Sequence, residues 1–134
     1  MSRAGQSITE ITETIVGCAY TVGDTLGAGF LETVYKNALA RELHAHGLQV
    51  CKHHAIQVYY DHAVVGEYIA DMVVEGCVLV ELKALRAVEE VHLAQCLNYL
   101  KATGMHLCLL INFGAPRVTV KRIVHNRFID DEQP

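Results

Sequence analysis

The sequence predicts an α/β protein in which helices flank a mixed β-sheet, with elements in the order α-α-β-β-β-α-β-β. Three observations predict this class. Apolar residues recur at helical spacing in the first third of the chain, they crowd into short β-rich runs in the middle, and helical spacing returns once before two further strands. With 134 residues, 51% apolar and 19% charged, the chain is expected to form one domain over residues 1–134, with its core at about 8–124.

Two helices are expected first. Ser7 and Glu10 have the spacing of a capping box, and the helix that they open carries an apolar face to about Val22. The glycine-containing segment 26–29 ends that helix. A second helix is expected over about 30–46, because apolar residues return at helical spacing and Gly47 is a natural stop.

The middle of the chain predicts strands at residues 55–60, 64–74 and 77–84. The connections between them are short, so neighbouring strands must be antiparallel. A helix over residues 88–103 then leads to strands at 105–113 and 117–124. A helix that crosses to a further strand gives a mixed sheet.

Asp71, Glu81 and Lys83 lie inside the most apolar of these strands. Burying a carboxylate or an ammonium group is costly unless the group is paired or binds a metal. Glu81 and Lys83 are two residues apart, so they project from the same face of one strand. These three residues are therefore the first candidates for a functional site.

The position of Asp71 depends on the turn at Glu75-Gly76. A two-residue turn would place Asp71 opposite Val80, on the wrong face for Glu81. We expect a turn with one more residue, or a bulge with Gly76 left-handed, which would place Asp71 opposite Leu79 and diagonal to Glu81.

Two carboxylates on one face are suitable ligands for Mg²⁺ or Mn²⁺. Such an ion polarises a phosphate and lowers the pKa of a bound water, and Lys83 would orient that water or stabilise developing charge. The alternative is an ion pair between Lys83 and a carboxylate at the end of a strand, with Asp71 as a turn residue. The three residues alone do not separate these interpretations.

Other kinds of site are not expected. The five cysteines are scattered without a C-x-x-C pair, which indicates reduced core thiols in a cytoplasmic protein. The histidine pairs at 44/46 and 53/54 lack the usual spacing of metal ligands, so no dedicated histidine site is expected. No apolar run is long enough to span a membrane, and residues 1–7 do not resemble a signal peptide.

The net charge of −4 is the wrong sign for binding nucleic acid through overall electrostatics. Basic residues do gather near the end of the chain, before an acidic tail at residues 130–134. They are Arg117, Lys121, Arg122 and Arg127. They form either a solvated strand face or a local track for phosphates.

Taken together, the chain resembles the GxxExxY family of the PD-(D/E)XK nuclease-like (restriction endonuclease-like) superfamily. Residues 29–35 contain the GxxExxY motif, and Asp71 with residues 81–83 matches the acid and Glu-x-Lys elements. Gln95 and Tyr99 are similar to the Q-x-x-x-Y element of exonuclease-like branches. One departure is that the acid follows Ala70 rather than proline.

The resemblance implies a Mg²⁺- or Mn²⁺-dependent nuclease that hydrolyses phosphodiester bonds, with DNA favoured over RNA. Asp71 and Glu81 would bind the metal, and Lys83 would assist the water. Glu32, in the first turn of its helix, would add a ligand or an acceptor. Gln95 and Tyr99 share a helix face and would support the site.

The alternative function is a catalytically silent nuclease-fold module that binds nucleic acid or a protein partner, which the acidic net charge favours. A homodimer would enlarge the binding surface, although the sequence indicates no interface.

Overall fold

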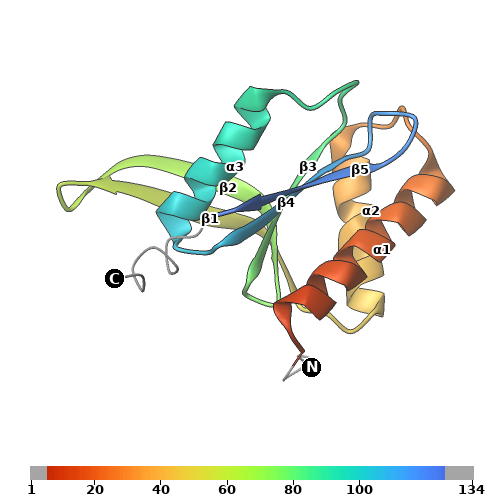
Figure 1. Ribbon diagram of the computed structural model, residues 1–134, viewed down its shortest axis with the longest axis horizontal. Coiled ribbons are helices and arrows are strands. Elements are labelled where there is room, and N and C mark those ends of the chain that lie inside the picture. The colour runs from red at the N-terminus through yellow and green to blue at the C-terminus, as the bar shows by residue number, and fades with distance from the viewer. Residues whose placement is uncertain (1–5, 126–134) are drawn as a thin grey trace.

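The computed structural model describes residues 6–125, and the predicted class and element order are confirmed (Figure 1). The acidic tail at 130–134 and Arg127 lie outside the described residues. The elements are α1 (Ile8–Leu26), α2 (Glu32–Ala45), β1 (Val50–Tyr60), β2 (Ala63–Val74), β3 (Val78–Lys83), α3 (Glu90–Thr103), β4 (Leu107–Asn112) and β5 (Thr119–Val124).

The strands form one sheet in the order β1-β2-β3-β4-β5. Neighbouring strands are antiparallel except for β3 and β4, which are parallel because α3 carries the chain across between them. Figure 1 shows α1 and α2 together on one side of the sheet and α3 on the other. No helix within residues 6–125 is both long enough and apolar enough to cross a membrane.

The first helix confirms the predicted capping box. The Ser7 hydroxyl accepts from the Glu10 N–H at 3.1 Å, and the Glu10 carboxylate accepts from the Ser7 N–H at 2.8 Å. The helix ends at Leu26 rather than near Val22. Gly23 lies inside the helix, where the absence of a side chain leaves room for Val118. An added Cβ would lie 2.1 Å from Val118 Cγ2.

The segment before α2 is shaped by Gly29 and Tyr35. Gly29 has φ +114°, a conformation that L side chains rarely adopt. The buried Tyr35 hydroxyl donates to the Gly27 carbonyl at 2.5 Å and accepts from the Phe30 N–H at 3.1 Å. Consequently α2 begins at Glu32, two residues later than expected, and Glu32 occupies its first turn as predicted.

The first strand is the least accurate of the predicted elements. It begins at Val50 rather than residue 55, because the exposed segment from Cys51 to His53 lies at the sheet edge and lacks an apolar pattern. The other strands begin and end within about two residues of the predicted positions, as does α3.

The core forms two clusters, one on each face of the sheet. Val78, Val80 and Leu82 pack with α1 and α2, as expected from their alternation along β3. Leu79 packs on the other face with α3.

Side-chain alternation along β2 is interrupted at Asp71. Ala70 packs in the α3 cluster, whereas Met72, two residues later, packs in the α1–α2 cluster. His53 on β1 lies across from this interruption, because its two neighbours in the strand pair with Met72 and Ala70. His53 also has the unusual φ of +58°. The alternation of side chains in the β1–β2 hairpin is therefore shifted by one residue at Asp71. The Asp71 side chain consequently does not take the regular position on either face of the sheet.

Candidate active site

The turn before β3 brings Asp71 and Glu81 to the same part of the hairpin. Three residues separate the paired Val74 and Val78, and Glu75 and Gly76 have φ values of +53° and +68°. The predicted odd-length turn with a left-handed Gly76 is therefore confirmed.

The predicted register is wrong by two residues. Met72 pairs with Val80, so the next position along the hairpin sets Asp71 opposite Glu81 rather than opposite Leu79. Each residue added to the turn moves the partner of Asp71 one position farther along the second strand. The expectation moved this partner one position back instead. Both acids still lie on the same face of the hairpin, as expected. Because they are directly opposite each other, they lie closer than diagonal neighbours would.

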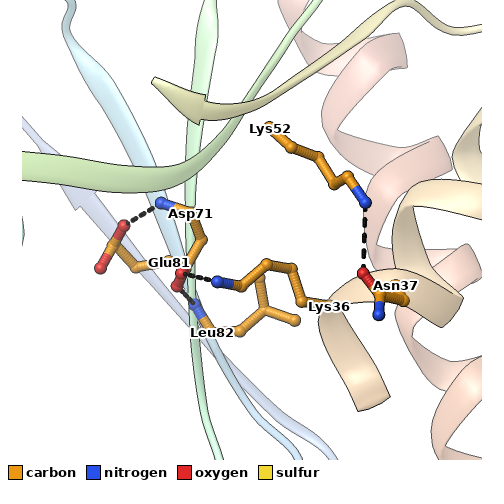
Figure 2. Close-up of polar contacts among 6 residues, drawn as sticks. All are labelled: Lys36, Asn37, Lys52, Asp71, Glu81 and Leu82. Atoms are coloured by element: carbon orange, nitrogen blue, oxygen red, sulfur yellow. Dashed lines mark hydrogen bonds and ion pairs between the residues drawn. The ribbon is translucent and has the colours of Figure 1, made fainter. Parts of the chain in front are cut away.

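Each carboxylate is held by the backbone of the opposite strand. The Asp71 N–H donates to Glu81 Oε2 at 2.7 Å, and the Leu82 N–H donates to Asp71 Oδ2 at 2.7 Å (Figure 2). These side-chain contacts replace the regular ladder, whose last pair is Met72 with Val80. Two backbone donors therefore fix the acids in position and leave a second oxygen on each of them for other contacts.

Lys36 provides the positive charge next to this pair. Its Nζ lies 2.8 Å from Asp71 Oδ1, and the two side chains are only 14% and 13% exposed (Figure 2). Sequence reasoning missed Lys36. The available signal was its position one helical turn after Glu32, which places both residues on the same face of α2.

The electrostatics of the site are set first by burial and then by repulsion between the acids. Burial and then the neighbouring Asp71 carboxylate raise the pKa of Glu81 from 4.5 to about 7, against the opposing effects of the Asp71 N–H and Lys83. The pKa of Glu32 is also raised, first by burial and then by Asp71, while Lys83 and Lys36 lower it. All five charged side chains thus belong to one electrostatic cluster.

The end of β3 that carries Lys83 is fixed by a residue whose role the sequence did not reveal. Asn112 is buried, its Oδ1 accepts from the Leu85 N–H at 2.9 Å, and its Nδ2 donates to the Leu85 carbonyl at 2.9 Å. Gly114 permits the same close approach, because an added Cβ would lie 2.2 Å from the Leu85 nitrogen. A polar residue ending an otherwise apolar strand was the available signal.

Tyr99 connects the acid pair to a groove. It is 6% exposed, so it belongs to the core rather than to its edge. Burial and then the charges of Glu81 and Asp71 raise the pKa of Tyr99 to about 12. Gln95 and Tyr99 line one wall of a groove of about 800 Å³ between α3 and the β1–β2 hairpin, with Tyr68 on the other wall.

The donor set fits a hard divalent cation in part. Asp71 and Glu81 offer carboxylate oxygens, and a cation between them would offset the repulsion that raises the pKa of Glu81. Within residues 6–125, ligand atoms of Glu32, Asp71 and Glu81 do not all lie within 4.8 Å of one another. Glu32 as a third metal ligand stays a prediction, and it requires movement of its side chain.

Two comparisons with known proteins give a match. A family model described as the PD-(D/E)XK nuclease superfamily matches residues 9–123. Among solved structures, the fold is similar to an alkaline exonuclease from Laribacter hongkongensis, with a TM-score of 0.53 and 14% identity over 98% of this chain and 76% of that one. No curated protein matched the sequence. At this identity the structural likeness concerns the fold alone.

Proposed function

The chain belongs to the PD-(D/E)XK nuclease superfamily, and from its acid pair we propose that it is a Mg²⁺- or Mn²⁺-dependent nuclease acting on DNA. One observation carries the proposal. The Asp71 and Glu81 carboxylates are both held by backbone N–H groups of the opposite strand in a buried setting, where burial and then the Asp71 charge raise the pKa of Glu81 to about 7. A divalent cation would allow both to ionise.

The roles of the residues follow from their positions. Asp71 and Glu81 would hold the metal, and Glu32 would supply a further ligand or a hydrogen-bond acceptor. A bound divalent cation polarises the scissile phosphate and lowers the pKa of the attacking water. Lys83, whose charge acts on both Glu81 and Glu32, orients that water and stabilises the negative charge that develops on the phosphate.

The groove beside Tyr99 supports nucleic acid as the substrate. Its lining includes the rings of Tyr59, Tyr68 and Tyr99, and the Tyr68 and Tyr99 ring centroids are 5.7 Å apart. Aromatic side chains stack with bases of any sequence, and Gln95 contributes an amide for hydrogen bonds. This contact does not depend on net charge, which accounts for an acidic protein binding nucleic acid.

A catalytically silent binding module is the second candidate. The ion pair between Lys36 and Asp71 favours it, because the ammonium group already neutralises one acid in the absence of metal. Isothermal titration with Mn²⁺ separates the candidates. The nuclease requires binding that is lost in Asp71→Asn, whereas the silent module requires no metal.

Activity is tested with single-stranded and double-stranded DNA and RNA in the presence of Mn²⁺ or Mg²⁺. We expect cleavage by the wild type, strongest on DNA, and loss of cleavage in Lys83→Ala and Asp71→Ala. Arg41→Ala, an exposed change on α2, serves as the control. Cleavage that persists in both site variants would mean a contaminating enzyme and would refute the proposed mechanism.

The remaining expectations are part of the same proposal. All five cysteines are free, which supports a reducing compartment and a cytoplasmic location. A homodimer stays a prediction, and sedimentation of the purified protein would test it.

A further inference from the structure

A second cluster of potential metal ligands lies between α1 and the end of α2. Cys18 is buried on α1, Glu42 lies in the last turns of α2, and His46 is the residue that caps this helix. One ligand atom from each of the three lies within 4.8 Å of the others. Glu42 is ten residues beyond Glu32 on the same helix, or about 15 Å at about 1.5 Å per residue. The cluster is therefore separate from the acid pair.

The distances are close to those around a tetrahedral zinc ion. Cys18 Sγ lies 3.5 Å from His46 Nδ1, and His46 Nδ1 lies 3.8 Å from Glu42 Oε2. Typical zinc bond lengths with tetrahedral angles separate sulfur and nitrogen by about 3.5 Å, and nitrogen and oxygen by about 3.4 Å. A small rotation of the Glu42 side chain, which is one-third exposed, would shorten the nitrogen-to-oxygen distance to the value around zinc.

Three polar groups surround the imidazole of His46. Its Nδ1 faces the Cys18 sulfur and the Glu42 carboxylate, and lies 2.9 Å from the Glu42 carbonyl oxygen. A neutral ring carries either one hydrogen or one lone pair on Nδ1, so Nδ1 donates to the Glu42 carbonyl or accepts from the Cys18 thiol, but does not do both. A cation that displaces the Cys18 proton would bind the sulfur, the imidazole nitrogen and the carboxylate oxygen together.

We propose that Cys18, Glu42 and His46 form a zinc site that joins α1 to the end of α2. Thiolate and imidazole ligands favour Zn²⁺ over Mg²⁺ or Mn²⁺, whereas the oxygen-only pair at Asp71 has the reverse preference. Three protein ligands leave a fourth position for water. The site clamps the helix that carries Glu32 and Lys36, and it takes no part in the hydrolysis.

The test uses the full chain without a histidine tag, treated with a chelator and then given Zn²⁺ or Co²⁺. We expect about one equivalent of Zn²⁺ to remain after dialysis. We also expect a thiolate-to-cobalt absorption band with Co²⁺, and a melting temperature raised by several degrees when free zinc exceeds the dissociation constant a hundredfold.

Matched variants decide whether these three residues are responsible. His46→Gln changes a half-exposed side chain and should fold, so loss of the bound zinc and of the melting shift is expected. Cys18→Ser should lose the cobalt band. His44→Gln, two residues away, and Asp71→Asn should both retain zinc. Failure of the wild type to retain zinc, or equal retention by His46→Gln, would overturn the proposal without bearing on the nuclease.

Discussion

Replacing Glu81 by glutamine tests the central electrostatic argument. The raised pKa means that the folded protein favours the protonated, neutral form of Glu81 more than the unfolded chain does. The free energy of unfolding should therefore fall as pH rises from about 4.5 to about 7, and change little above that range for this group. Glutamine is neutral at every pH and can still accept from the Asp71 N–H. The free energy of unfolding of the variant should therefore not show this fall with rising pH.

The size of the effect follows from the pKa. The rise from 4.5 to about 7, at about 1.36 kcal/mol for each pH unit, amounts to about 3 kcal/mol. The side chain is 4% exposed, so solvent screening reduces this figure little. Without metal, Glu81→Gln should be more stable than the wild type by about 2–3 kcal/mol at pH 8 and about equal to it at pH 4.5.

Urea denaturation in a chelating buffer at pH 4.5, 6 and 8 measures this difference. Glu13→Gln, an exposed change on α1, is the matched control and should behave as the wild type at each pH. Added Mn²⁺ should stabilise the wild type more at pH 8 than at pH 6, and should stabilise Glu81→Gln less at both. If the variant is no more stable than the wild type at pH 8, Glu81 ionises without penalty and the argument for a metal between the acids is wrong.

Three other substitutions test the surroundings of the acid pair. Lys36→Met removes the ammonium group beside Asp71; the metal-free protein should lose about 1–3 kcal/mol of stability, and the melting shift caused by Mn²⁺ should grow. An unchanged shift would mean that Lys36 does not compete with metal. Asn112→Ala leaves both backbone groups of Leu85 without their partner and should cost about 2–4 kcal/mol in urea denaturation. A loss below about 1 kcal/mol would contradict that role. Tyr68→Ala should weaken single-stranded DNA binding in a chelating buffer by about 1–3 kcal/mol, measured by fluorescence anisotropy, and equal affinity would exclude stacking on this ring.

The fold was predictable because its strongest signals are local. The capping box, the apolar periodicity of α1 and the short hairpin turns each depend on residues close together in sequence. The start of β1 was missed because an edge strand needs no apolar alternation, and its polar first half resembles a loop. Only pairing with β2 defines it as a strand.

The predictable part of the site is the part that depends on which face of a strand each residue occupies. Asp71, Glu81 and Lys83 were identified from charge within apolar strands, and the structure brings the two acids together. Lys36 and Asn112 were missed because their roles depend on contacts across the fold.

The cysteine–histidine cluster was missed for a related reason. Histidine pairs close in sequence have a recognisable ligand spacing, whereas the cluster combines a Glu42–His46 helical pair with a cysteine 28 residues before His46. Long-range ligand sets of mixed type have no spacing that a single sequence can show.

The phase change at Asp71 explains how one residue serves both faces of the sheet. With regular alternation, an acid on the α3 face could approach Glu81 and Tyr99 but could not reach α2 on the other face. The interruption between Ala70 and Met72 lets Asp71 accept from β3 while its other oxygen meets Lys36. An exchange of the ammonium for the proposed metal ion would then require movement of one lysine side chain, because backbone hydrogen bonds already hold both acids. The distorted edge hairpin thus creates the site rather than merely bordering it.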